Sequence, residues 1–238
     1  WLYRSKWNTE SPTLHLLPHW NWKGREGKVT PVVVYTSWPK AELFVNGKSM
    51  GIKEKPAPSV LDYTEVARTP YWERERVKDV SAHNDSLAMN RYRLIWDDVV
   101  YQPGEVKVIA YDEAGNKAGE LARITAGKAH HIVLTPDRQE ITADGNDLVY
   151  VTVEVADKNG NIVPDDTRIV DFKVSGSAEF LATANGDPTC LLSFDAPRMK
   201  LFSGAATAIL RAAPTPGKAT LTVTAPGVRP ATITIDVR

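Results

Sequence analysis

The chain has 238 residues, and its 29 Lys and Arg residues balance its 29 Asp and Glu residues, so the formal net charge is zero. Without an excess of positive charge it is a poor candidate for binding nucleic acid or an anionic membrane surface, and its length is typical of two domains. One cysteine, Cys190, allows neither an intrachain disulfide nor a thiolate metal site, so the cores must be stabilised by packing.

The chain begins with an aromatic stub, residues 1–7 (WLYRSKW), which has no Met and no helix-capping residue before it. This pattern indicates the end of an element whose start lies upstream, so we expect the chain to be a fragment of a longer protein. No basic and apolar secretory leader opens it. No run approaches the roughly 20 apolar residues of a membrane span, so we expect no membrane insertion.

Short alternating or β-branched runs, separated by turn residues, indicate strands in the first half of the chain. They are residues 29–35, 41–45, 91–96 and 105–111. Asn46–Gly47 predicts a tight hairpin turn. Residues 53–90 interrupt this rhythm with prolines and a charged run, and we interpret them as an insertion. Its aromatic residues indicate that it packs down, and they are Tyr63, Tyr71 and Trp72.

The strand pattern restarts near residue 128, where we place the domain boundary. The strands expected beyond it are 131–134, 148–155, 170–174, 205–211, 219–225 and 231–237. Segments 106–116 and 151–161 are each a strand that ends in Asp-x-x-Gly-Asn, a hairpin turn in which glycine supplies a positive φ. The sequence thus predicts an all-β fold with two consecutive β-sandwich domains, residues 1–127 and 128–238.

No carboxylate pair stands out as a catalytic acid and base. Glu73 and Glu75 alternate with arginines in a charged run, and Asp97 and Asp98 follow a strand, so we interpret all four as solvated or turn-capping. Cys190 has no local partner to activate it. We therefore predict no catalytic residue.

Two segments resemble metal sites weakly. His15 and His19 are four residues apart, but Pro18 lies between them and the flanking residues look extended. The loop 157–161 echoes the start of a calcium-binding loop but lacks the required downstream Glu. We predict neither a metal site nor a cofactor.

The segment from Leu14 to Gly27 is the best candidate for a binding site. Trp20 and Trp22 could stack on sugar rings while Arg25 and Glu26 bond hydroxyl groups, which predicts a substrate-binding site. The alternative, which we favour, is that the two tryptophans form a wedge between domains.

The motifs in residues 1 to about 126 carry a family resemblance. The runs LHLLPHWNWKGREGKVTPVVVYTSWPKAELFVNGKSMG and RYRLIWDDVVYQPGEVKVIAYD resemble the domain that follows the catalytic barrel in family 2 glycoside hydrolases, especially the β-galactosidases of gut Bacteroidetes. The stub at 1–7 is similar to the closing helix of that barrel. Residues 53–90 depart from the family pattern as an insertion.

Residues 129–238 resemble the further C-terminal domain of the same enzymes, through LTPDRQEITADGNDLVYVTVEVADKNGNIVP and ANGDPT. That domain is itself similar to invasin-like bacterial immunoglobulin modules, so the resemblance implies two immunoglobulin-like sandwiches. It also implies a periplasmic or secreted β-galactosidase-like hydrolase, whose catalytic glutamates lie in an upstream barrel.

The expected function is therefore accessory: the chain supports the barrel, its main partner, and is inactive alone. The resemblance leaves the oligomeric state open. One alternative is a carbohydrate-binding module that uses Trp20 and Trp22. Another is a cell-surface adhesin built from immunoglobulin-like modules, although the two domains differ in length and motif, whereas adhesin arrays repeat one module.

Overall fold

The structure is a computed structural model that describes residues 1–56 and 90–238. It divides into two compact units, Trp1–Thr125 (unit 1) and Ala126–Arg238 (unit 2). The boundary expected from the sequence was after residue 127. Both units are built almost entirely of strands in paired sheets, so the predicted all-β sandwich fold is confirmed. The central part of the predicted insertion, with Tyr63, Tyr71 and Trp72, lies outside the described residues.

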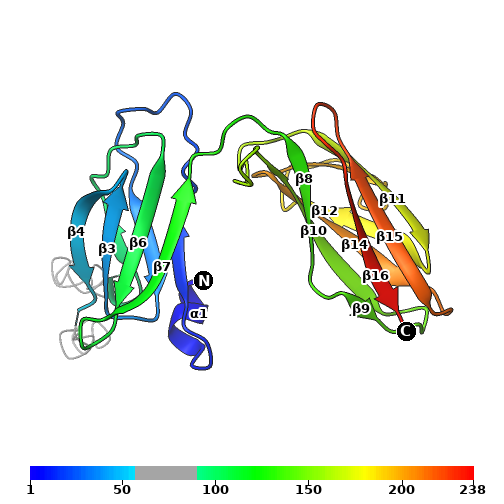
Figure 1. The fold of residues 1–238 in the computed structure, drawn as a ribbon, viewed down its shortest axis with the longest axis horizontal. Coiled ribbons are helices and arrows are strands. Elements are labelled where there is room, and N and C mark those ends of the chain that lie inside the picture. Colours follow the sequence, from blue (N-terminus) through cyan, green and yellow to red (C-terminus); the bar gives the residue numbers. More distant parts are fainter. Residues whose placement is uncertain (57–89) are drawn as a thin grey trace, which may run out of the picture. The chain divides into compact units, whose positions relative to one another are not determined.

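Unit 1 is a two-sheet sandwich with a short helix beside it (Figure 1). One sheet has the strand order β1-β2-β5 and the other has the order β4-β3-β6-β7. The elements are α1 (Leu2–Trp7), β1 (Leu14–Leu17), β2 (Val32–Thr36), β3 (Lys40–Val45), β4 (Lys48–Glu54), β5 (Leu94–Trp96), β6 (Glu105–Tyr111) and β7 (Lys117–Ile124). Helix α1 packs near β2.

Alternation of side chains builds the core of unit 1. In β2, β3 and β6 every second residue is buried, because successive side chains of a strand point to opposite faces. The buried set includes Val34, Leu43, Trp96 and Val108. Asn46 and Gly47 both have positive φ, 49° and 79°, which confirms the tight hairpin turn between β3 and β4.

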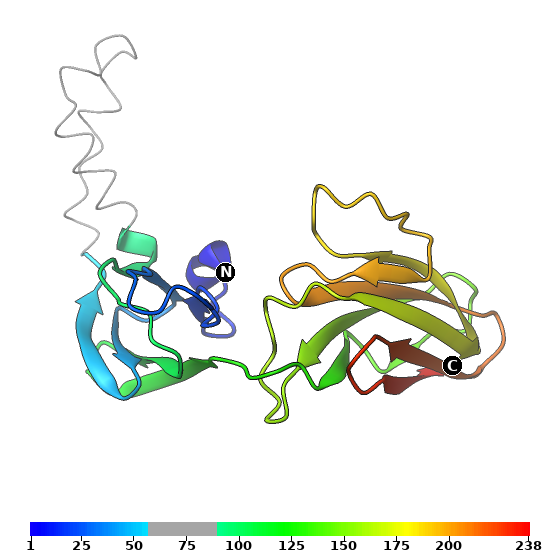
Figure 2. The same ribbon diagram turned by 90° about the horizontal axis from the view of Figure 1, so that it is seen from above.

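Unit 2 is a second sandwich with its own core. Its sheets have the strand orders β12-β14-β10-β8 and β13-β11-β15-β16-β9, and their two layers can be followed in Figure 2. The strands are β8 (His131–Pro136), β9 (Glu140–Ile141), β10 (Leu148–Ala156), β11 (Ile169–Gly176), β12 (Ala178–Ala184), β13 (Arg198–Lys200), β14 (Ala205–Ala212), β15 (Gly217–Thr224) and β16 (Ala231–Val237). All pairs are antiparallel except β16 with β9.

The two Asp-x-x-Gly-Asn turns have the same geometry. The Asn116 amide donates to Asp112 Oδ1 at 2.8 Å, and the Asn161 amide donates to Asp157 Oδ1 at 3.0 Å. The glycine of each turn has a φ of 85°. In unit 2 the aspartate is buried and also receives the backbone N–H of Gly127 at 2.8 Å, so this turn holds the segment that leads into β8.

Candidate functional site

Trp20 lies in the core of unit 1, with only 1% of its surface exposed. Its indole Nε1 donates to the backbone carbonyl of Gln102 at 3.0 Å, and its ring meets Tyr101 edge-on at a centroid distance of 5.1 Å. This burial corrects both predicted roles of Trp20. Its ring has no free face on which a sugar could stack, and it is covered by its own unit rather than by a neighbouring domain.

Trp22 is only half buried, and its ring is already engaged. His19 stacks on it at a centroid distance of 4.3 Å, and the Arg25 guanidinium lies 5.8 Å from its centroid. Its indole Nε1 is buried and has no hydrogen-bond partner among the described residues. Buried N–H groups nearly always have a hydrogen-bond acceptor, so the indole N–H of Trp22 is an exception in this loop.

Arg25 and Glu26 are exposed in the turn after Trp22. Arg25 Nη2 donates to the carbonyl of Val29 at 2.8 Å, so the arginine holds the turn closed as well as lying over Trp22. The structure brings the ring of Trp22 and the guanidinium of Arg25 together, whereas the ring of Trp20 lies in the core of unit 1. The predicted sugar-binding role of Trp22, Arg25 and Glu26 stays a prediction.

The two histidines considered as metal ligands have separate partners. His15 on β1 stacks on Trp1 at a centroid distance of 4.3 Å, whereas His19 stacks on Trp22. Within residues 1–56 and 90–238, no three His, Cys, Asp or Glu side chains are grouped so that they could hold a metal ion. Cys190 packs partly against the core of unit 2, with its Sγ 3.8 Å from Met199 Sδ.

The structure describes some of the carboxylates that the sequence analysis considered for catalysis or metal binding. Asp97 and Asp98 are exposed in the turn after β5, whereas Glu73 and Glu75 lie outside the described residues. Asp157 accepts four hydrogen bonds from Gly127, Asn159 and Asn161. Burial acts to raise its pKa, but these bonds prevail and lower it to about 2, so the loop is a hydrogen-bonded turn.

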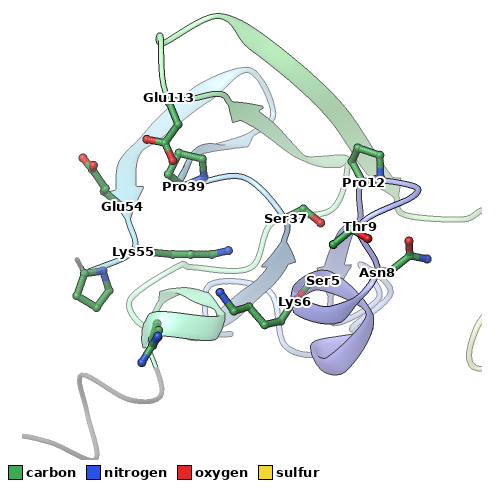
Figure 3. A pocket seen from close by; sticks show the side chains of 12 residues that line it. Ser5, Lys6, Asn8, Thr9, Pro12, Ser37, Pro39, Glu54, Lys55 and Glu113 are labelled. Carbon is green, nitrogen blue, oxygen red and sulfur yellow. The ribbon is translucent and has the colours of Figure 1, made fainter. Parts of the chain in front are cut away.

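A pocket that sequence patterns do not reveal lies in unit 1 between helix α1 and the end of β4 (Figure 3). Its volume is about 630 Å³, within the range of small-molecule sites. The residues that line it are Ser5, Lys6, Asn8, Thr9, Pro12, Ser37, Pro39, Glu54, Lys55, Pro56, Arg91 and Glu113.

Lys55 has the most strongly shifted pKa among the side chains that line this pocket. Its Nζ donates to the backbone carbonyl of Thr36. Burial, with the charge of Lys6 adding to it, lowers the pKa of Lys55 from 10.5 to about 8. Because Lys6 and Lys55 are far apart in the sequence and belong to no motif, only the fold could reveal that they share a pocket.

Comparison with known proteins places both units. Residues 132–234 match the glycoside hydrolase family 2 C-terminal domain 5, and residues 27–119 match a domain of unknown function, DUF4982. The chain is 39% identical over 237 residues to a β-galactosidase of Bacteroides ovatus, an alignment that covers 99% of this chain and 24% of that protein. No helix in the described part of the chain has the length and apolar character needed to span a membrane.

Solved structures give the same result. A β-glycosidase from Bacteroides vulgatus superposes with a TM-score of 0.79 and 28% identity, covering 99% of this chain and 26% of that one. A family 2 glycosyl hydrolase from Bacteroides cellulosilyticus superposes with a TM-score of 0.75 and 28% identity, covering 98% of this chain and 30% of that one. The chain therefore spans about a quarter of the length of the proteins that it matches.

Proposed function

This chain belongs to the C-terminal domains of glycoside hydrolase family 2, and we propose that it is a non-catalytic part of a β-galactosidase-like hydrolase that supports the catalytic domain. The observation that carries this proposal is the alignment of nearly the whole chain with about a quarter of a β-galactosidase, together with the match of residues 132–234 to a family 2 C-terminal domain. The reaction itself is assigned to an upstream barrel of the same polypeptide.

Helix α1 supplies a surface for that upstream partner. The aromatic side chains of the helix and of the residue before it are exposed: Trp1 to 57%, Tyr3 to 65% and Trp7 to 71%. Tyr3 and Trp7 stack on each other at a centroid distance of 4.7 Å, so together they present an apolar patch. Large exposed apolar patches mark interaction sites, and this one lies at the first helix of a chain whose relatives are about four times as long.

The proposal extends to a compartment and a substrate class. We place the parent hydrolase in the periplasm or outside the cell, as the resemblance to Bacteroidetes β-galactosidases implies, with β-galactosides as substrates. Its oligomeric state is not part of the proposal. The adhesin alternative has less support, because the two units match two different families rather than one repeated module.

A second candidate function is carbohydrate binding through Trp22. The partly exposed ring of Trp22 favours it, because a sugar ring could stack on the accessible part of the indole. Arg25, whose guanidinium lies over the ring, and the exposed Glu26 would complete the contact.

Activity and binding measurements on the 238-residue chain test the proposal. We expect no hydrolysis of a chromogenic β-galactoside and no heat of binding with galactose or lactose. Turnover that scales with this chain and survives contaminant controls would overturn it. Saturable sugar binding that is lost in Trp22→Ala but kept in Trp7→Ala would instead establish the carbohydrate-binding function.

A further inference from the structure

Two lysine ammonium groups converge in the pocket of unit 1. Lys6 extends from helix α1 and Lys55 follows β4, and Figure 3 shows the nitrogen ends of both side chains directed toward each other. Like charges that share a partly buried site repel each other, and the lowered pKa of Lys55 reflects this repulsion in addition to burial.

No carboxylate of the described residues neutralises this pair. Neither Lys6 nor Lys55 forms an ion pair within residues 1–56 and 90–238. Two glutamates also line the pocket, but Figure 3 shows Glu54 and Glu113 on the side away from the two nitrogens, and Glu54 pairs with Lys40 at 3.7 Å. The region between the ammonium groups is therefore positive.

The two ammonium groups are the donors of this positive region. Ser37 and Thr9 also line the pocket, but Figure 3 shows their oxygens on the side away from the two lysine nitrogens. Two converging ammonium groups can hold a carboxylate or sulfate through charge-assisted hydrogen bonds.

We propose that this pocket binds an oxyanion, a carboxylate or a sulfate group, between Lys6 and Lys55. The negative charge would relieve the repulsion between the two lysines. The group could be part of a free small molecule or a carboxylate side chain from elsewhere in a longer polypeptide. The site does not depend on the proposed function, because all its walls belong to unit 1.

Titration of the 238-residue chain with inorganic sulfate and with acetate, at low ionic strength, tests this site. We expect one saturable event seen by calorimetry, and NMR resonances of the Lys6 and Lys55 side chains that shift with the same midpoint. At saturation the pKa of Lys55 should rise from about 8 back toward 10.5. Lys6→Gln should weaken binding about tenfold or more, since a charged hydrogen-bond donor is lost.

Lys53→Gln is the matched control, because Lys53 is an exposed lysine on β4 outside the pocket. Lys6 is itself exposed on α1, so its substitution should leave the fold intact even if Lys55→Met does not. Absence of saturation, or equal weakening by Lys6→Gln and Lys53→Gln, would mean an adventitious ion only and would overturn the proposal.

The source of the anion is decided by repeating the titration with a longer protein that contains this chain. If free sulfate and acetate still bind, the pocket serves a small molecule. If they bind only to the 238-residue chain, a carboxylate of the longer polypeptide occupies the pocket. Both results keep the oxyanion site, and neither depends on whether the longer protein hydrolyses a β-galactoside.

Discussion

The indole Nε1 of Trp20 donates a hydrogen bond to the backbone carbonyl of Gln102, 3.0 Å away, and so joins the loop after β1 to the loop before β6. The same ring packs against Tyr101, which is also fully buried. Trp20, for which the sequence suggested an interdomain wedge or a sugar contact, is thus part of what holds the sandwich of unit 1 together.

We predict that Trp20→Ala lowers the free energy of unfolding of unit 1 by about 3–5 kcal/mol, because a large buried side chain leaves a cavity. Trp20→Phe should cost less, since it keeps most of the packing and loses the bond to Gln102. Trp22→Ala, at a half-buried position, is the control and should cost the least. Urea unfolding followed by fluorescence measures all three, and equal losses for Trp20→Ala and Trp22→Ala would contradict the assignment.

The two Asp-x-x-Gly-Asn turns offer a matched pair of substitutions. Asp157→Ala removes the acceptor of four hydrogen bonds at a buried site, so we expect a loss of about 2–3 kcal/mol in unit 2. Asp112→Ala, in the more exposed turn, should cost clearly less. The comparison uses the unfolding midpoints of the two variants, and a larger loss for Asp112→Ala would refute this account.

The lowered pKa of Asp157 predicts that its contribution to the stability of unit 2 depends on pH. Its folded-state pKa of about 2 lies below the ordinary value of 3.8, so its contribution is complete above pH 3.8 and is lost as the pH falls toward 2. The stability difference between the wild type and Asp157→Ala should therefore shrink between pH 4 and pH 2. A difference that stays constant over this window would show that the carboxylate is not held by these bonds.

The lowered pKa of His15 predicts that the stability of unit 1 falls in acid. Burial, helped by the charge of Arg123, lowers its pKa from 6.5 to about 4. Between these values the unfolded chain binds a proton that the folded chain does not, so stability falls as the pH drops from 6.5 to 4. We expect a loss on the order of 1–2 kcal/mol, reduced by partial exposure, that is absent in His15→Gln. Parallel stability curves for the two proteins would exclude this role.

Arg168 and Asp166 form a partly buried ion pair in unit 2, in which the carboxylate is the more buried partner. Arg168 Nε lies 2.8 Å from Asp166 Oδ1 and its Nη2 lies 2.7 Å from Oδ2, while Nη1 donates to the carbonyl of Pro226 at 2.6 Å. Arg168→Met leaves a buried carboxylate without its cation and should cost about 3 kcal/mol. Arg168→Lys keeps the charge but not the bidentate geometry. In thermal unfolding its stability should therefore lie between those of the wild type and Arg168→Met.

The strands with strong β-branched alternation were predictable from the sequence. Segments 105–111 and 231–237 became β6 and β16 with the predicted limits, because alternating valine and isoleucine side chains fit a half-buried strand. Strand β7, KAGELARI, was not predicted, because its composition favours neither strand nor core. It forms because it pairs along its length with β6, a tertiary contact that local sequence does not encode.

The binding features were less predictable than the fold. Two tryptophans in one short loop look equivalent in the sequence, yet Trp20 is buried and Trp22 is partly exposed, since burial depends on which residues the fold brings over each ring. The Lys6 and Lys55 pocket had no sequence signal at all, because it arises from the packing of a helix near strands from another part of the chain.

A segment exchange in the Bacteroides ovatus β-galactosidase tests the central claim most directly. The segment of that enzyme that aligns with this chain would be deleted in one variant and replaced by these 238 residues in another. If this chain supports a catalytic domain, deletion should abolish stable folding and hydrolysis of a chromogenic β-galactoside, and the replacement should restore both. A deletion variant as stable and active as the parent, or a replacement no better than the deletion, would contradict the supporting role.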